Sequence, residues 1–503
     1  MNHRLPDADA RLAALEERIR QDLDVSSHQR DWVPRPDGDV LDVLVVGGGQ
    51  AGLAVAFALG RERIDHVRVV DDGPEEQAGA WNRYARMHTL RSPKHMVGIE
   101  MDVPSLHLQR WFEAVYGDQA WEQTTLVGRQ DWNSYLIWYR KVTGVQVRHL
   151  TRVVAVHRPE RPDGPFAIDT VPATDPTACV QQLRARRVVF ALGLDGGGGP
   201  SVPAILRDLP KERWAHTEDA IDFDSLRGRR VAVLGGGASG FDNAATALEH
   251  GAASAEVFMR RSEVPTENPL RWMEFPGMQE HFADLEDEQR WEFTEFNGGL
   301  PQPPTQHAIW RCFDQPGFAL HMESGWNAVE VTDGPSGEEL LVHTTQGDIR
   351  ADFVIAATGY AVDLGLRPEL AEFVDDISRW EEHLPESAGQ AYGRAPYLGP
   401  AFEFTARDVD RAPWVSRLYH FSTGARSSMG VTGNQLSGIH GGVKRIAWGI
   451  TGSIFRENWP TLMAEFRNYH HVEITSVGPR DTDGPDYPRF ASFRRPPRKS
   501  IAP

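Results

Sequence analysis

Cysteine is scarce in this sequence. Only Cys179 and Cys312 occur among 503 residues, and they lie far apart in the chain. Two such cysteines cannot form the C-x-x-C pair of dithiol redox enzymes, and they provide no disulfide framework. The scarcity fits a reducing compartment, so we expect a cytoplasmic protein. We expect no bound metal.

Long apolar runs and an excess of basic charge are also missing. No stretch approaches the roughly 20 consecutive apolar residues that cross a bilayer. The N-terminus, MNHRLPDADARLAALEERIRQDL, is charged and amphipathic and lacks the features of a secretory signal, so we expect a lead-in helix. The formal net charge of −18 argues against nucleic acid and anionic membranes as partners.

Glycine, by contrast, is concentrated in two similar motifs. The segments VLDVLVVGGGQAGLAVAFALG and RRVAVLGGGASGFDNAATALEHG each predict an apolar strand, a G-x-G-x-x-G turn and an apolar helix. This context makes the motif credible, because glycine-rich turns alone are common. The motif glycines are Gly47, Gly49 and Gly52 in the first copy and Gly235, Gly237 and Gly240 in the second.

Each motif predicts a cradle for the pyrophosphate of a dinucleotide. The first glycine permits the tight turn, the second lets the backbone approach the phosphates, and the third lets helix and strand pack closely. The helix N-terminus offers N–H groups and partial positive charge, at Gln50 in the first copy and Ser239 in the second. Two cradles imply two dinucleotides and electron transfer between them.

The residues after the next strand distinguish the two cofactors. The strand HVRVV ends at Asp71, whose carboxylate can accept hydrogen bonds from an adenosine ribose and would repel a 2′-phosphate. This favours FAD in the first cradle. The strand AEVFM is followed by Arg260 and Arg261, whose guanidinium groups can pair with a 2′-phosphate and so favour NADPH. The alternative is that these two arginines are a solvated surface pair.

The order of the motifs predicts the domain organisation. The chain leaves the first nucleotide unit, passes through the second, and returns for its last part. We expect an α/β protein with two Rossmann-like dinucleotide-binding domains, the NADPH domain inserted into the FAD domain, each with a parallel sheet covered by helices. The expected units are residues 1–205 (FAD domain, first part), 206–357 (NADPH domain), 358–475 (FAD domain, second part) and 476–503 (flexible tail).

Several segments together carry a family resemblance. VVGGGQAGL, GAWNRY, VLGGGASGFDNA and IAATGY, in this order over roughly residues 40 to 450, resemble the flavin-containing monooxygenases. They are similar also to the Baeyer–Villiger and N-hydroxylating monooxygenases, and the resemblance is to a divergent branch rather than to any one subfamily. The resemblance implies that NADPH reduces FAD, and that a peroxyflavin then transfers one oxygen atom from O2 to a small molecule.

The resemblance also implies which residues lie near the flavin. Gly79 and Trp81 match the glycine–tryptophan segment beside the flavin, and Arg91 stands where relatives have an asparagine. The further expected cofactor contacts are Val153, Gly359, Asn434 and Gln435, the last two where a C-terminal helix points its N-terminus at the flavin. His216 lies in the linker, where it either acts at a hinge or is simply hydrogen-bonded.

Three side chains are candidate catalytic groups. Arg91 and Lys94 can stabilise negative charge near the flavin, and His440 can shuttle a proton. The alternative for Arg91 and Lys94 is that they belong to an ordinary surface loop. The alternative for His440 is that it is a packed histidine on a capped helix.

The substrate class stays open. Oxidation of an amine nitrogen is the first interpretation and Baeyer–Villiger oxidation of a ketone, favoured by the W-N-R-Y run, is the second. A reductase without oxygen transfer and a non-catalytic nucleotide sensor are the other function classes. The expected partners are a small-molecule substrate and O2, and a homodimer is the assembly that we consider.

Overall fold

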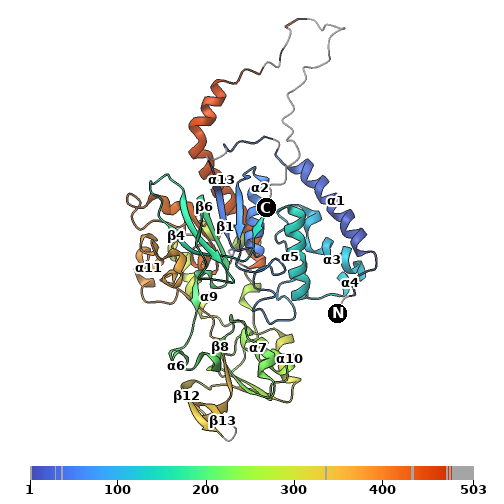
Figure 1. Ribbon diagram of the computed structural model, residues 1–503, viewed down its shortest axis with the longest axis vertical. Helices are drawn as coiled ribbons and strands as arrows, with labels where there is room; N and C mark the ends of the chain where they lie inside the picture. The colour runs from blue at the N-terminus through green and yellow to red at the C-terminus, as the bar shows by residue number, and fades with distance from the viewer. Residues whose placement is uncertain are drawn as a thin grey trace.

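The computed structural model describes residues 3–28, 30–34, 38–334, 337–431, 435–471, 474 and 477–478 (Figure 1). Asn434 and most of the tail at 476–503 therefore lie outside the described residues. The chain forms an α/β structure with two separate sheets that contain parallel strands. In Figure 1 the second sheet, with β8, lies below the first, with β1 and β6.

The first sheet has the strand order β3-β2-β1-β6-β5-β4, and a further strand, β17, pairs with the end of β6. The strands are β1 (Val40–Val46), β2 (Val67–Val70), β3 (Val147–Arg148), β4 (Thr151–His157), β5 (Phe166–Pro172), β6 (Gln181–Gly193) and β17 (Leu418–Ser422).

The expectation of a wholly parallel first sheet is wrong for two strands. β3, β2, β1, β6 and β17 are parallel neighbours, whereas β4 and β5 pair antiparallel with each other and β5 pairs antiparallel with β6. Consecutive strands joined by short loops form antiparallel pairs, whereas a parallel pair needs a longer crossover.

Helices cover the first sheet because their apolar faces match its apolar strands. α2, which follows β1, is buried along almost its whole length and packs against α13. α1 packs on α3, as expected for a lead-in helix (Figure 1). The helices are α1 (Ala8–Ser26), α2 (Gln50–Arg61), α3 (Leu108–Tyr116), α4 (Asp118–Gln123), α5 (Arg129–Thr143) and α13 (Leu436–Arg467).

The second sheet is parallel throughout, in the order β11-β10-β9-β15-β8. Helices α7 (Ala238–Glu249) and α10 (Gln306–Phe313) pack together beside it around a core that includes Phe241 and Cys312. The strands are β8 (Trp214–His216), β9 (Arg230–Leu234), β10 (Ser254–Phe258), β11 (Phe318–His321) and β15 (Phe353–Ala356).

A smaller antiparallel sheet, β12-β13-β14, is attached to the second sheet. Its strands and the short helix α6 share an apolar cluster with the second sheet, through residues such as Leu206, Phe258 and Leu340. The elements are α6 (Ala204–Arg207), β12 (Trp326–Gly334), β13 (Gly337–Thr344) and β14 (Gly347–Ala351).

The segment between β10 and β11 also contributes helices that pack on the returning part of the chain. Trp291 of α9 lies against Trp380 of α11, and Phe282 packs with Val431. The segment contributes α8 (Pro276–His281) and α9 (Asp287–Gly299), and the returning part of the chain contributes α11 (Trp380–His383) and α12 (Arg426–Met429). Helices inserted between two strands of the second sheet therefore pack against the part of the chain that follows β16.

Two short strands mark where the chain passes between the sheets. β7 (Gly198–Pro200) leads toward the second sheet and β16 (Tyr360–Val362) leads back, and the two pair antiparallel. The two crossings are thus hydrogen-bonded to each other. None of the helices among the described residues is long and apolar enough to cross a membrane.

Candidate functional site

The first glycine motif forms a tight turn at the carboxyl end of β1. Gly47 has a φ of 109°, a conformation that favours glycine, and its N–H donates to the Val70 carbonyl at 2.8 Å. A Cβ on Gly47 would lie 2.4 Å from the Ala191 carbonyl oxygen, and one on Gly52 would lie 1.9 Å from the Gly47 carbonyl oxygen. Side chains are thus excluded at both positions by the backbone.

Asp71 closes the first turn from the end of β2. Its carboxylate accepts hydrogen bonds from the Gly48 N–H at 2.5 Å and the Gly73 N–H at 2.7 Å. Burial raises the pKa of Asp71, while the two backbone hydrogen bonds lower it. The carboxylate therefore lies where the sequence predicted it, beside the glycines.

The second motif repeats this geometry at the end of β9. Gly235 has a φ of 121° and donates to the Phe258 carbonyl at 2.9 Å. A Cβ on Gly235 would lie 2.3 Å from the Ala357 carbonyl oxygen, and one on Gly240 would lie 2.0 Å from the Gly235 carbonyl oxygen. A Cβ on Gly237 would meet no heavy atom within 4 Å, so the space above the start of α7 is open.

The two turns differ at one equivalent position that the sequence analysis did not single out. Asp71 follows β2, and the residue that follows β10 is Met259. A Cβ on Gly48 would touch Asp71 at 3.0 Å, and one on Gly236 would touch Met259 Cβ at 2.7 Å. A neutral side chain therefore occupies, in the second cradle, the place of the acid in the first.

The two arginines beyond Met259 differ in their contacts. Arg261 donates from Nη2 to the Gly236 carbonyl at 3.1 Å, which ties it to the second turn. Arg260 is exposed and makes no hydrogen bond or ion pair with the described residues. Ser239 lies in the first turn of α7 and contributes its carbonyl to a hydrogen bond from Asn243 Nδ2 at 2.8 Å.

The residues expected beside the flavin gather near the first turn. A Cβ on Gly49 would lie 3.4 Å from Gly79 Cα, so the two glycine backbones approach closely. Trp81 packs edge-on against the buried Trp132 of α5, with ring centroids 6.3 Å apart. Val153 lies in β4, two residues after Thr151, whose N–H donates to the Asp71 carbonyl at 2.8 Å.

Arg91 lies between the two sheets. Its guanidinium donates to the Pro303 carbonyl, and its own carbonyl accepts from Arg271 Nη2 at 2.6 Å. Burial lowers the pKa of Arg91, and the nearby Asp242 of α7 raises it. The cation thus contacts the segment that precedes α10 and faces the second cradle helix.

The other two catalytic candidates hold loops in place. Lys94 Nζ donates to the Trp121 carbonyl at 2.5 Å and lies over the Trp121 ring. His440, on α13, lies 3.1 Å from the Asp102 carboxylate through Nε2. Lys444, one turn further, forms a 2.8 Å ion pair with the same carboxylate. Gln435 precedes α13 at its N-terminus.

The crossing between the sheets brings His216 together with two titratable residues that the sequence did not single out, Glu218 and Tyr360. His216 Nε2 lies 3.1 Å from the Gly359 carbonyl, and its ring packs edge-on against Tyr360. Burial together with the charge of Asp195 raises the pKa of Glu218 to about 7, and the charge of Glu218 in turn helps to raise the pKa of Tyr360. His216 is thus hydrogen-bonded beside the crossing, which agrees with both interpretations, and its role at a hinge stays a prediction.

A buried ion-pair network joins α7 and α10. Arg311 binds Asp242 at 3.1 Å and Glu249 at 2.8 Å, and donates to the Arg86 carbonyl at 3.3 Å. Burial raises the pKa of Asp242 to about 6, against the opposing charge of Arg311. This network was not predictable from the sequence, because its members are spread over more than 200 residues.

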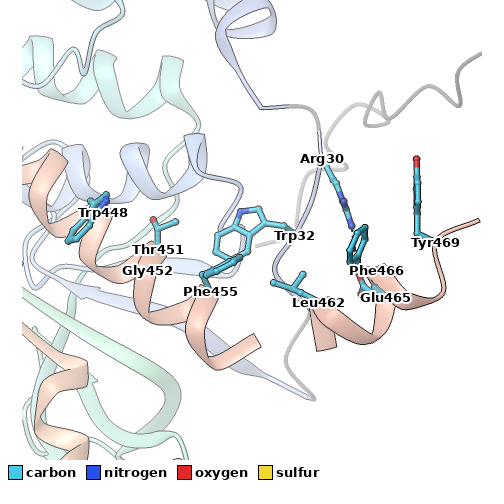
Figure 2. Close-up of a pocket in the computed structure, with 10 residues that line it drawn as sticks. All are labelled: Arg30, Trp32, Trp448, Thr451, Gly452, Phe455, Leu462, Glu465, Phe466 and Tyr469. Atoms are coloured by element: carbon cyan, nitrogen blue, oxygen red, sulfur yellow. Dashed lines mark ion pairs between the residues drawn. The ribbon is translucent and has the colours of Figure 1, made fainter. Parts of the chain in front are cut away.

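A groove lies away from both cradles, along the second half of α13 (Figure 2). Its volume is about 570 Å³, and it is lined by aromatic residues such as Trp32, Trp448 and Phe455. No predicted site residue lines it.

The cysteines provide no redox pair. Cys179 is exposed, whereas Cys312 is buried in α10 and burial raises the pKa of its thiol to about 12. Among the described residues, no group of three or more His, Cys, Asp or Glu could hold a metal ion.

The fold and the sequence match known proteins. The chain is 38% identical, over 94% of its length and 99% of the relative, to the FAD-dependent urate hydroxylase of Xanthomonas campestris pv. campestris. The family model for L-lysine 6-monooxygenase/L-ornithine 5-monooxygenase matches residues 118–303.

Two solved structures share the fold at low sequence identity. The ornithine hydroxylase of Pseudomonas aeruginosa has a TM-score of 0.62 at 16% identity, over 82% of this chain and 99% of that one. The ornithine N-hydroxylase of Kutzneria sp. 744 has a TM-score of 0.62 at 18% identity, over 83% of this chain and 100% of that one. The resemblance found in the sequence is thus confirmed, and the chain belongs to the flavin-dependent monooxygenases, a family of oxidoreductases, together with the FAD-dependent urate hydroxylase.

Proposed function

We propose that this enzyme uses FAD and NADPH to insert one atom of dioxygen into urate or a closely related oxidised purine. The observation that carries the proposal is the 38% identity to a FAD-dependent urate hydroxylase across 94% of this chain. The two glycine cradles offer one site for each dinucleotide, as such a reaction requires. This substrate class replaces the amine as our first candidate.

The first cradle fits FAD. The turn at Gly47 and Gly52 has no room for side chains, so its backbone can approach a pyrophosphate. Asp71 is buried beside the turn, where its carboxylate can accept hydrogen bonds from ribose hydroxyls. In this assignment residues 1–205 and 358–475 form the FAD domain, and Gly79, Trp81, Val153 and Gln435 lie near the flavin.

The second cradle fits NADPH rather than NADH. Met259 occupies the place of an acid and so presents no charge that would repel a 2′-phosphate. Arg260 is exposed without a partner among the described residues, and we assign it to that phosphate. Arg261 supports the turn through the Gly236 carbonyl. Residues 206–357 form the inserted NADPH domain in this assignment.

The chemistry divides between cofactor and protein. When bound, FAD accepts the hydride of NADPH and passes the electrons to dioxygen. One oxygen atom enters the substrate, and the other leaves as water after NADPH and a proton have supplied two electrons and two hydrogens. The protein orients the dinucleotides at the carboxyl ends of its parallel strands and excludes water. Arg91, between the sheets, provides positive charge, whereas Lys94 and His440 position the loops that they bind.

A second candidate is N-hydroxylation of an amine. The family model for lysine and ornithine monooxygenases matches residues 118–303, which include α5 and the second cradle. This observation favours a substrate with a primary amine. Baeyer–Villiger oxidation of a ketone remains only the interpretation of the W-N-R-Y run.

The test is NADPH oxidation and oxygen uptake by the FAD-loaded enzyme with urate, L-ornithine, L-lysine and a cyclic ketone as separate substrates. We expect urate to accelerate both rates and to give a product heavier by one oxygen atom. Acceleration by an amine alone would favour the second candidate. NADPH oxidation that yields only hydrogen peroxide with every substrate would favour the reductase without oxygen transfer.

A further inference from the structure

One guanidinium group of the described residues stands out by its surroundings. Arg426 begins α12, directly after residues 423–425, which follow β17. Arg426 is half-buried, and burial lowers the pKa of its guanidinium. Among the described residues it forms no hydrogen bond through its side chain and no ion pair. A buried cation is normally paired, so this position calls for a ligand with negative charge.

The backbone around Arg426 is fixed. Thr423 Oγ1 donates to the Gly193 carbonyl at 3.1 Å, which ties the turn to the end of β6. Ser428 Oγ accepts from Trp380 Nε1 at 2.9 Å and from the Leu398 N–H at 3.0 Å. Arg290 donates to the Ser428 carbonyl at 3.2 Å, which joins α9 to α12. Arg426 is thus presented by a rigid turn, as a binding residue should be.

The position of this turn is where ligands bind in such sheets. β6 and β17 are parallel, and Arg426 follows the carboxyl end of β17. Ligands of open α/β sheets bind outside the carboxyl ends of the strands. The first cradle lies at the carboxyl end of β1, which also pairs with β6, so Arg426 and the expected FAD site share one edge of the sheet.

One residue that interacts with Arg426 is aromatic. The Arg426 guanidinium interacts electrostatically with Tyr392. The Tyr392 ring lies against α9, where a Cβ on Gly298 would be 2.6 Å from the ring. A planar, mostly apolar surface therefore lies beside the cation, which suits a flat heterocycle.

We propose that Arg426 binds the substrate, through the negatively charged ring and carbonyl oxygens of an oxidised purine such as urate, and so determines specificity for an anionic planar heterocycle. This inference rests on the proposed function, which it deepens by naming the residue that recognises the substrate. A guanidinium donates from a planar fork that matches two adjacent acceptors on such a ring.

The experiment compares Arg426→Gln and Arg426→Lys with the wild-type, FAD-loaded enzyme. Arg161→Gln is the matched control, because Arg161 is an exposed arginine whose side chain is 78% accessible and pairs only with the exposed Asp163. Binding is measured without NADPH by the change in flavin absorbance on titration with urate, an anion at neutral pH, and with caffeine, an uncharged purine. FAD content and the KM and kcat for urate are measured on the same preparations.

We expect Arg426→Gln to weaken urate binding roughly ten- to a hundredfold and to raise KM, with FAD content and caffeine binding unchanged. Arg426→Lys should recover part of the affinity, and Arg161→Gln should match the wild type. Loss of FAD from Arg426→Gln would overturn the inference, since the residue would then bind the flavin. Equal urate affinity in wild type and variant would overturn it too.

Failure of the proposed function gives a different result. Urate that binds in an Arg426-dependent manner but is not oxidised would support this inference and refute the reaction. Wild-type enzyme that does not bind urate would overturn both the inference and the urate assignment.

Discussion

In the proposed assignment, single residues decide which dinucleotide each cradle takes. Asp71 and Met259 stand at equivalent places after the second strand of their motifs, and they differ in charge. A carboxylate at this place accepts hydrogen bonds from ribose hydroxyls and repels a 2′-phosphate, whereas a thioether does neither. The backbone turns are alike, so the choice between FAD and NADPH falls to these side chains and the arginines beyond.

Replacing Asp71 with alanine should weaken FAD binding. The variant loses the ribose hydrogen bonds, each of which contributes about 0.5–1.5 kcal/mol net. FAD affinity is measured by fluorescence titration of the apoprotein. Asp163→Ala serves as control, because the Asp163 side chain is 84% accessible on the surface. An Asp71→Ala protein with the FAD affinity of the wild type would contradict the assignment.

Replacing Arg260 with alanine should raise the KM for NADPH and leave that for NADH nearly unchanged. Loss of one charge-assisted contact to the 2′-phosphate costs about 1.5–3 kcal/mol. Arg261→Ala should affect both coenzymes alike, since Arg261 supports the turn itself. Stopped-flow flavin reduction measures both, with the exposed Arg227→Ala as control. Equal use of NADH and NADPH by the wild type would show that the arginines serve another purpose.

At the scale of elements, the glycines of one turn have separable tasks. In the second cradle, Gly240 allows α7 to approach the turn, whereas Gly237 leaves space open above it. Packing and binding thus depend on different glycines of the same motif.

Gly237→Ala should fold normally and lose NADPH binding, whereas Gly240→Ala should be unstable. The new Cβ at Gly237 meets no protein atom, so Tm should change by less than about 2 °C. The Cβ at Gly240 would lie 2.0 Å from a carbonyl oxygen, and relieving this contact costs about 1–3 kcal/mol. Thermal unfolding and coenzyme titration separate the two effects. Normal NADPH affinity in Gly237→Ala would place the pyrophosphate elsewhere.

Glu218, near Tyr360 of the crossing β7–β16, should make the stability of the folded protein depend on pH. The pKa of Glu218 is raised by burial from 4.5 to about 7. The folded state therefore holds a proton that the unfolded chain releases, and the free energy of unfolding falls as pH rises between these two values. Above about pH 7 the folded protein carries the full cost of a buried charge.

Glu218→Gln should therefore be more stable than the wild type at pH 8, and the difference should shrink toward pH 5. The neutral amide removes the cost of ionisation and keeps the shape of the side chain. Tm measured across this range gives the difference, and Glu212→Gln, at an exposed position of the same linker, should show no such trend. A constant difference at every pH would rule out titration of Glu218 as the cause.

For the whole molecule, the local patterns were the predictable part. The strand, turn and helix of each cradle follow from apolar runs and glycine spacing, and Asp71 lies beside its turn as expected. The arginines after the second cradle were also visible in the sequence. That Met259 stands at the place of Asp71 became clear only when the two turns could be compared in three dimensions. Local sequence encodes local geometry, and it gives the register between distant strands only indirectly.

Contacts between distant segments were the unpredictable part. The network around Arg311 and the pairing of β7 with β16 each join residues that no spacing rule connects. Nothing in the sequence around Arg426 marks it as a cation that forms no side-chain hydrogen bond or ion pair with the described residues. Such features become visible only when burial and partners are known.

Incorporation of labelled oxygen tests the central claim most directly. The FAD-loaded enzyme is incubated with NADPH, urate and isotopically labelled dioxygen, and the product is analysed by mass spectrometry. We predict one labelled atom in the organic product for each NADPH that is consumed in its formation. A product without label, or consumption of NADPH with hydrogen peroxide as the sole oxygen product, would contradict the account.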